Sequence, residues 1–327
     1  MTKNQQLLAL AEGRAGLVLS GGGAKGAYQV GVVKCLVKHG VRLSAIAGTS
    51  VGALNGAVIA AAPDLDSAAD RLEEIWRERL PTILGRELSS LYDLLKAFQE
   101  LELSRELSSL YEEYMAPYEA SLEAGLSLYV GVFRSRGKLV DLAWATAGLI
   151  GLSDTPEADF IQVQTLPRRE YKEALLASAA YPLICATHSV EGQPYRDGGL
   201  GGMSNKQGHT PFAPLVHDAG CHAVIVIHNA DGSPWDRHDF PDVAVLEIRP
   251  GSPIRRRGGL FDTFDFNAEN IDALIEQGSQ DAERCLASAA HALILRKEDH
   301  AAQARLDRAI QQLANQQLID PDIRQRK

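Results

Sequence analysis

The chain has 327 residues, of which 45% are hydrophobic and 23% are charged. This is the composition of an ordinary globular protein, with room for one large α/β domain or two small ones. The formal net charge of -9 argues against a nucleic acid polymer as partner, because such binding draws most of its affinity from lysines and arginines that neutralise phosphates. The four cysteines lie far apart without a C-x-x-C pair, so we predict neither a metal site nor a disulfide framework.

Two apolar stretches bear on where in the cell the protein resides. Residues 7–11 are the apolar part of a polar N-terminal segment and are too short for the apolar region of a secretory signal. We therefore expect a cytoplasmic protein. Residues 142–153 form the longest nearly uncharged stretch, about a dozen residues against the roughly 20 that a spanning helix needs. Any contact with lipid is therefore expected to be peripheral, at a membrane surface.

The first predicted elements form a β-α-β unit with a second helix after it. Residues 17–20 are a short apolar run that ends in three glycines, which is typical of a buried strand entering a tight turn. Apolar residues at helical spacing predict a helix over 27–39, and residues 43–47 form a second buried strand. A helix of small residues follows as far as Ala62, and Pro63 ends it.

Residues 66–124 are predicted to be a helical insert. They contain the heptapeptide R-E-L-S-S-L-Y twice, at 86–92 and 105–111. We interpret this as a chance or recent local duplication, because a solenoid needs at least three units.

The rest of the chain alternates between strands and helices. We predict strands at 128–133, 160–164, 223–228 and 243–248, a helix at 169–180, a hairpin at 189–195, and two amphipathic helices from 267 to about 317. Strands interleaved with helices favour a mostly parallel sheet that is covered on both faces.

The pattern G-x-S-x-G occurs at Gly48, Ser50 and Gly52, where a buried strand turns into a helix. The glycines permit a strained turn that lifts the serine hydroxyl off the sheet edge. The N-terminus of the following helix then places free N–H groups and a positive dipole end beneath a developing negative charge. Ser50 is therefore the candidate nucleophile.

The glycine-rich loop also matches G-x-G-x-x-G, from Gly21 to Gly26, so a dinucleotide-binding fold has to be weighed. That fold needs an acidic residue at the end of the second strand to hold a ribose. Residues 45–48 contain none, so we do not expect a nucleotide cofactor.

A right-handed crossover makes the first two strands parallel, so the glycine loop and the Ser50 turn emerge at the same sheet edge. Consecutive glycines expose backbone N–H groups, which can form an oxyanion hole. We predict that Gly22 and Gly23 are the donors. Lys25 is a candidate contact for an anion, with a solvated side chain as the alternative.

A serine hydroxyl is a poor nucleophile until a base accepts its proton. Asp197 is the candidate base, because Gly198 and Gly199 follow it and let another backbone approach closely. A triad of serine, aspartate and histidine stays open, since several histidines lie close to or after Asp197, among them His188, His209, His217, His222, His228 and His238. His209 is the strongest alternative among them.

The glycine loop, the G-x-S-x-G turn and the D-G-G motif, in this order, resemble the patatin-like phospholipases. The resemblance extends from about residue 17 to the D-G-G motif and includes residues 177–182, A-S-A-A-Y-P. It implies a three-layer α/β/α fold and a dyad of Ser50 and Asp197 that cleaves acyl esters of phospholipids or other lipids without metal or cofactor.

On this resemblance, residues 15–216 are expected to form the catalytic core, helical insert included. Residues 217–327 would supply the remaining strands and the C-terminal helices of the same domain. One departure concerns residues 200–209, which intervene before Thr210 and Pro211, where the family usually runs within a few residues into an Asn-x-Pro type segment. This extension bears on the shape of the acyl pocket.

We therefore predict a lipid acyl hydrolase of the phospholipase A or lysophospholipase type that acts through an acyl-enzyme. A ligand-responsive regulatory or binding module with the same fold is one alternative, and a phospholipase effector that needs an activator is another. The three arginines at 255–257, beside Phe261, Phe264 and Phe266, would suit anionic headgroups and shallow insertion. A plain loop with core-facing phenylalanines is the simpler interpretation.

Overall fold

The computed structural model describes residues 15–85, 103–137, 140–141, 143–144, 155–181, 185–202, 207–230, 235, 237–254 and 260–289. The chain divides into two compact units, residues 1–283 and 284–327. Of the second unit only residues 284–289 are described, and they are helical. The fold and the site below belong to the first unit.

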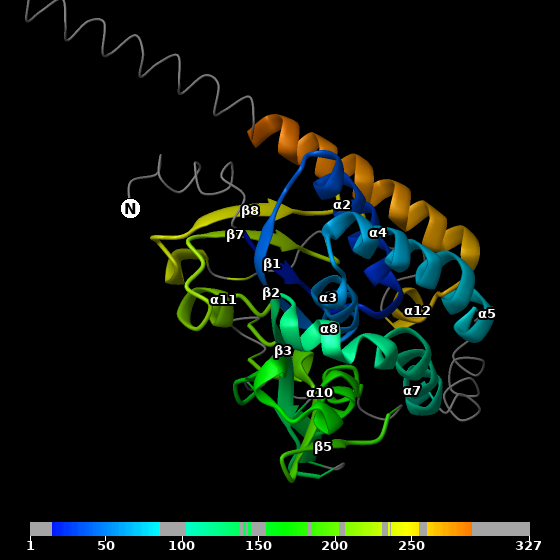
Figure 1. The fold of residues 1–327 in the computed structure, drawn as a ribbon, viewed down its shortest axis with the longest axis vertical. Helices are drawn as coiled ribbons and strands as arrows, with labels where there is room; N and C mark the ends of the chain where they lie inside the picture. Colours follow the sequence, from blue (N-terminus) through cyan, green and yellow to red (C-terminus); the bar gives the residue numbers. More distant parts are fainter. Residues whose placement is uncertain are drawn as a thin grey trace, which may run out of the picture. The chain divides into compact units, whose positions relative to one another are not determined.

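An eight-stranded sheet lies at the centre of this unit, in the order β5-β6-β3-β2-β1-β7-β8, with β4 also paired to β3 (Figure 1). The strands are β1 Ala15–Leu19, β2 Leu43–Thr49, β3 Ser127–Arg134, β4 Asp159–Gln162, β5 His188–Val190, β6 Gln193–Asp197, β7 Ala223–Ile227 and β8 Ala244–Ile248. The pairs from β3 through β2, β1 and β7 to β8 are parallel. β4, β5 and β6 are antiparallel additions at the β3 side, so the sheet is mixed.

The helices of the first half follow the predicted order. They are α2 Gly26–Lys38, α3 Val51–Ala61, α4 Leu65–Glu74, α5 Leu80–Leu84, α7 Leu103–Tyr114 and α8 Glu119–Ala124. A π-helical turn, Ile75–Arg79, joins α4 to α5. The second copy of the repeated heptapeptide lies in α7, whereas the first lies outside the described residues.

The later helices are α10 Tyr171–Ser178, α11 Ala213–His217 and α12 Leu260–Thr263, and another helix begins at residue 268. The predicted hairpin is β5-β6. Most of the apolar stretch at 142–153, the arginines at 255–257 and the second predicted C-terminal helix lie outside the described residues. None of the helices described is long and apolar enough to cross a bilayer.

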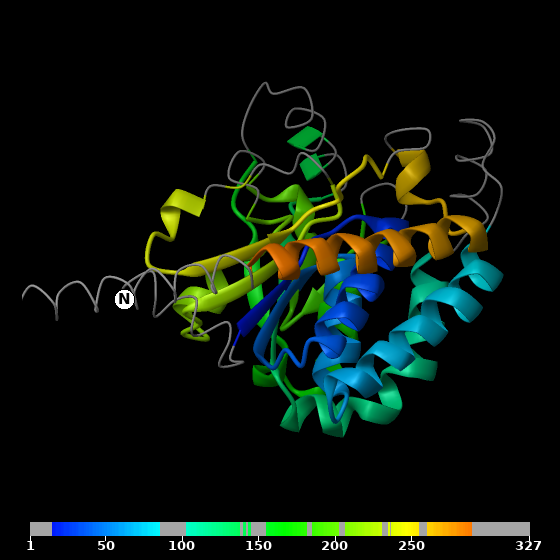
Figure 2. The same cartoon turned by 90° about the horizontal axis from the view of Figure 1, so that it is seen from above.

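Alternate residues of the parallel strands face opposite sides of the sheet. On one face Leu19, Ile46 and Leu128 pack against Gly56 of α3, and Figure 2 shows the blue and cyan helices α2 to α5 gathered on this side. On the other face, Val18 and its neighbours pack against α11 and a cluster of aromatic side chains, Phe212, Trp235 and Phe240. Both faces are therefore covered, the first by a thick helical layer and the second by a thin one.

Candidate active site

Ser50 lies between β2 and α3 with a φ of 57°. A positive φ is uncommon outside glycine and costs on the order of 1–3 kcal/mol. The flanking glycines make this turn possible. A Cβ on Gly48 would lie 2.3 Å from the carbonyl oxygen of Gly52, and a Cβ on Gly52 would lie 2.1 Å from that of Leu19. The strained turn predicted from G-x-S-x-G is therefore confirmed.

The glycine loop runs directly beside Ser50. A Cβ on Gly21 would lie 3.4 Å from the Ser50 Cβ. Gly22 and Gly23 have φ values of 153° and 58°, and a Cβ on Gly23 would lie 2.2 Å from the carbonyl oxygen of Thr263. Among the described residues, no acceptor engages the N–H of Gly22 or Gly23. The two groups that sequence reasoning selected as donors therefore lie near Ser50 and are free to bind an anion.

Asn229, which follows β7, fixes this loop. Its Nδ2 donates to the carbonyl oxygens of Ser20 at 2.9 Å and Gly21 at 3.1 Å, and the side chain is almost fully buried. The N–H of Gly21 donates to the carbonyl oxygen of His209 at 3.1 Å. The extension after the D-G-G motif thus returns to the site and holds one end of the loop.

Asp197, the last residue of β6, reaches Ser50 across β3. Thr49 pairs with Gly131 on one edge of β3, and Asp197 pairs with the next residue, Val132, on the other edge. The Ser50 hydroxyl lies close enough to the Asp197 carboxyl to lower the pKa of that group. The structure therefore brings together the two residues that the motifs selected from positions 147 apart in the chain.

Burial dominates the chemistry of Asp197. It raises the pKa of the carboxyl from its ordinary 3.8 to about 6, against the lowering effects of the nearby Ser50 hydroxyl and of the hydrogen bond from the Gly199 N–H. The Gly199 bond measures 2.8 Å to Oδ1. A Cβ on Gly198 would lie 2.4 Å from the carbonyl of Gly131, so the close backbone approach predicted for D-G-G is confirmed. A carboxylate with this pKa suits a general base that works near neutral pH.

A buried ion pair anchors β6 one residue before Asp197. Arg196 Nε donates to Asp141 Oδ2 at 2.9 Å, and its Nη1 donates to the carbonyl oxygen of Cys185 at 3.0 Å. Both charged side chains are nearly fully buried. Loss of one partner of such a pair would leave an uncompensated buried charge, so the pair ties the position of Asp197 to the surrounding structure.

His209 is the histidine that approaches the site. Its ring carbon Cδ2 would lie 3.6 Å from a Cβ on Gly21 and 3.8 Å from a Cβ on Gly199. No histidine is among the groups that shift the pKa of Asp197. Two other candidates are engaged elsewhere, since His228 contacts Glu247 at 3.0 Å and His188 contacts Glu173 at 2.9 Å. The dyad of Ser50 and Asp197 stays a prediction, with His209 as the alternative partner nearest to the site.

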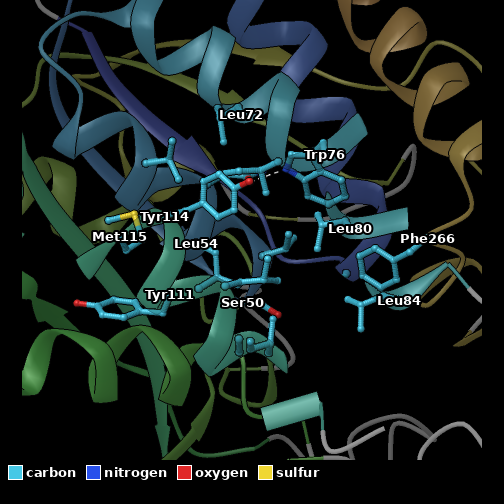
Figure 3. Close-up of a pocket in the computed structure, with 18 of the residues that line it drawn as sticks. Ser50, Leu54, Leu72, Trp76, Leu80, Leu84, Tyr111, Tyr114, Met115 and Phe266 are labelled. Atoms are coloured by element: carbon cyan, nitrogen blue, oxygen red, sulfur yellow. Dashed lines mark hydrogen bonds between the residues drawn. The ribbon is translucent and has the colours of Figure 1, made fainter. Parts of the chain in front are cut away.

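A cavity of about 140 Å³ opens at Ser50 (Figure 3). Its wall is almost entirely apolar and aromatic and comes from α3, α4, α5, α7 and the segment around α12. In Figure 3, Ser50 lies at one end, with Leu72 and Met115 on the far side from it. The predicted helical insert therefore supplies about half of the residues that line the cavity.

A chain of buried polar side chains that sequence reasoning missed connects the glycine loop with this cavity. Gln29 Nε2 donates to the carbonyl oxygen of Ser20 at 2.8 Å, Asn55 Nδ2 donates to Gln29 Oε1 at 2.9 Å, and Trp76 Nε1 donates to Asn55 Oδ1 at 2.9 Å. Asn55 and Trp76 line the cavity. The sequence contains one sign of this chain of polar side chains: a single amide residue in each of two largely apolar helices, Gln29 in α2 and Asn55 in α3.

The aromatic segment after the arginines faces inward. Phe266 stacks on Trp76 with ring centroids 6.2 Å apart, and Phe264 meets Tyr181 edge-on at 6.2 Å. Both phenylalanines line the cavity, which agrees with the simpler interpretation of core-facing rings. Lys25 ends a short 3-10 turn and is not among the described cavity residues.

One group of potential metal ligands occurs in the described part of the chain, Cys35, His39 and Glu283. The Glu283 oxygen of this group, Oε2, already accepts a hydrogen bond from Lys38 at 2.9 Å. The ammonium group of Lys38 thus places a positive charge where a metal ion would lie. Burial raises the pKa of the Cys35 thiol to about 11, which disfavours the thiolate that a metal requires. None of these residues lines the cavity.

A comparison with protein families matches residues 17–205 to the patatin-like phospholipases. Among curated proteins, lysophospholipase nte1 of Aspergillus terreus is 45% identical over 69 residues, which are 19% of this chain and 4% of that protein. Patatin-like phospholipase domain-containing protein 7 of Mus musculus is 35% identical over 82 residues, 25% of this chain and 6% of that protein. The chain thus spans a small fraction of the length of these relatives.

Two solved structures are similar at low sequence identity. VipD from Legionella pneumophila has a TM-score of 0.43 and 13% identity, covering 85% of this chain and 67% of that one. The type III effector protein ExoU has a TM-score of 0.34 and 17% identity, covering 85% and 53%. The family match spans more than half of the chain and contains the glycine loop, the Ser50 turn and the D-G-G motif, so the chain belongs to the patatin-like phospholipases, a family of lipid ester hydrolases.

Proposed function

We propose that this protein cleaves acyl esters of phospholipids, lysophospholipids or related lipids, with Ser50 as nucleophile and Asp197 as general base. The observation that carries the proposal is the placement of Ser50, which lines an apolar cavity, beside the buried carboxyl of Asp197 across β3. A phospholipid or other acyl-ester lipid is the proposed substrate. The predicted cytoplasmic location and peripheral contact with a lipid surface belong to the same proposal.

In the first step, the Ser50 oxygen attacks the ester carbonyl carbon while Asp197 accepts the hydroxyl proton. The carbonyl oxygen gains the displaced electron pair, and the free N–H groups of Gly22 and Gly23 stabilise it. The tetrahedral intermediate then expels the alcohol part of the lipid, which takes the proton from Asp197, and leaves an acyl ester on Ser50.

In the second step, a water molecule attacks the acyl-enzyme. Asp197 accepts a proton from this water, the oxyanion forms again at the glycine loop, and collapse of the intermediate releases the fatty acid. The proton returns to the Ser50 oxygen. These steps need one base and two backbone donors, roles that we assign to Asp197 and to the N–H groups of Gly22 and Gly23.

The cavity explains why the acyl part would be a hydrocarbon chain. Leu54 and Val58 lie one and two turns beyond Ser50 on α3, and both line the cavity. Burial of a methylene group against such side chains contributes about 0.8 kcal/mol. A bound acyl chain would therefore hold its ester carbon at Ser50 and leave the headgroup at the cavity mouth.

The test compares the protein with its Ser50→Ala variant on phospholipids, lysophospholipids and neutral acylglycerols, with released fatty acids measured by mass spectrometry. A fluorophosphonate probe is applied in parallel, because it labels only an activated serine. Ser189→Ala, at an exposed serine in β5, is the matched control. We expect cleavage and labelling in the protein and the control, and neither in Ser50→Ala.

Labelling of a folded Ser50→Ala variant at another serine would contradict the assignment of the nucleophile. Absence of both labelling and cleavage in the unmodified protein would support the alternative of a regulatory or binding module. Cleavage that appears only after an activator is added would support the regulated phospholipase.

A further inference from the structure

The segment Ala177–Pro182 contributed to the family resemblance but has no role in the steps above. Its first half ends helix α10 at Ser178. The Ser178 side chain is fully buried, so its hydroxyl has no access to solvent. Buried hydroxyl groups are usually paired, and the partners of this one lie at the proposed active site.

Both hydrogen-bonding functions of the Ser178 hydroxyl are in use. The N–H of Ser50 donates to Ser178 Oγ at 2.9 Å, and the Ser178 hydroxyl donates to the carbonyl oxygen of Gly131 at 2.7 Å. The direction of each bond is settled, because an N–H can only donate and a carbonyl can only accept. The Ser50 backbone is therefore linked through Ser178 to the strand that separates it from Asp197.

The same segment holds Asp197. The N–H of Asp197 donates to the carbonyl oxygen of Ala180 at 3.2 Å, two residues after Ser178. The backbones of the proposed nucleophile and the proposed base are thus both fastened to one short segment. Their separation then depends on this segment as well as on the pairing of β2, β3 and β6.

We propose that Ser178 is a positioning residue for the proposed reaction: its hydroxyl holds the Ser50 backbone in the strained conformation that presents the nucleophile to Asp197. A positive φ outside glycine persists only where contacts with the surrounding structure hold the backbone in that conformation. In the described structure, the hydroxyl of Ser178 is the only partner of the Ser50 N–H. This bond also commits the Ser50 N–H, so it is unavailable to the oxyanion and leaves that task to the glycine loop. The inference rests on the proposed function.

The test measures kcat, KM and the rate of fluorophosphonate labelling for Ser178→Ala and Ser178→Thr. The alanine variant removes the acceptor for the Ser50 N–H, so we expect kcat and the labelling rate to fall together by about 10- to 100-fold, the scale of a small misplacement of a reacting group. We expect KM to change less than about threefold. Ser178→Thr retains a hydroxyl and should recover most of the lost rate.

Gln164→Ala is the structural control. Gln164 accepts from the N–H of Leu128 at 3.0 Å and donates to the carbonyl oxygens of Leu122 at 3.1 Å and Leu126 at 2.8 Å, at the start of β3 and three residues before Gly131. Its replacement also removes side-chain bonds to buried backbone, so we expect a lower melting temperature with an unchanged kcat.

An unchanged kcat and labelling rate in folded Ser178→Ala, with a lower melting temperature like that of the control, would overturn the positioning role. If the alanine variant does not fold, Ser178→Cys replaces it, because a thiol is only a weak donor and acceptor, and an unchanged kcat there would have the same consequence. Failure of the proposed function is distinct, since the unmodified protein would then neither label nor cleave.

Discussion

Replacement of Asp197 by asparagine should abolish turnover and at the same time stabilise the fold at neutral pH. Asparagine keeps the size of the side chain and can still accept from the Gly199 N–H, but it cannot take up the serine proton. We expect turnover to fall by 10²- to 10⁴-fold, the scale of a lost general base. The stabilisation follows from burial, which makes the ionised form of Asp197 costly.

The magnitude follows from the pKa. A value of about 6 in the folded protein against an ordinary 3.8 corresponds, at 1.36 kcal/mol for each pH unit, to about 3 kcal/mol. Between these values the folded protein binds more protons than the unfolded chain, so its free energy of unfolding falls as pH rises. The stabilisation that proton binding supplies is lost almost completely by about pH 7. The variant lacks this titration and should gain roughly 2 kcal/mol over the unmodified protein as pH rises from 4 to 7.

Urea denaturation of both proteins at several pH values between 4 and 8 measures this difference, because other titrating groups are common to the two and cancel. The rate profile supplies a second measurement, since kcat/KM of the unmodified protein should decline below about pH 6, where Asp197 becomes protonated. A stability difference that stays constant with pH, or near-normal turnover in folded Asp197→Asn, would refute the reasoning.

Two further predictions concern the glycine loop and the cavity. Gly23→Ala should lower turnover by at least about 10²-fold, because the added Cβ would lie 2.2 Å from the carbonyl oxygen of Thr263 and displace a proposed oxyanion donor. A change smaller than threefold in a folded variant would mean that the loop serves another purpose. Val58→Phe should shift the released fatty acids towards shorter chains, since Val58 lies about 12 Å along α3 from Ser50. An unchanged chain-length profile, measured by mass spectrometry on mixed-chain lipid, would show that the acyl chain lies elsewhere.

The parts of the site that could be predicted from the sequence are those that local geometry determines. A strand, a tight turn and a helix follow each other at Ser50, and the glycines at 48 and 52 are needed within that turn. The glycine loop lies beside it because a right-handed crossover puts both at one sheet edge. The family and the α/β fold followed from these motifs and are confirmed.

The contacts that depend on long-range packing could not be predicted. The alternation of strands and helices predicted the parallel strands, and residues 189–195 predicted the hairpin β5-β6, but nothing in the sequence pattern indicated that β4 and β6 pair with β3 in antiparallel fashion. Ser178, Gln29 and Asn55 are polar residues that lie within helices. Their partners depend on which helices pack together, so neither helical spacing nor, for Ser178, the segment A-S-A-A-Y-P indicated which groups they would contact.

The π-helical turn between α4 and α5 has a consequence for how the acyl cavity can change among related chains. Residues 75–79 form the turn, Trp76 lies within it, and Leu80 and Leu84 line the cavity just after it. Successive helical residues are rotated by about 100°, and a π turn accommodates more residues than an α turn. The turn therefore absorbs one residue that would rotate Leu80 and Leu84 by about 100° if the helix were α-helical throughout. A chain one residue shorter here could keep the same cavity wall with an ordinary α-helix, so this part of the wall tolerates a one-residue change in length.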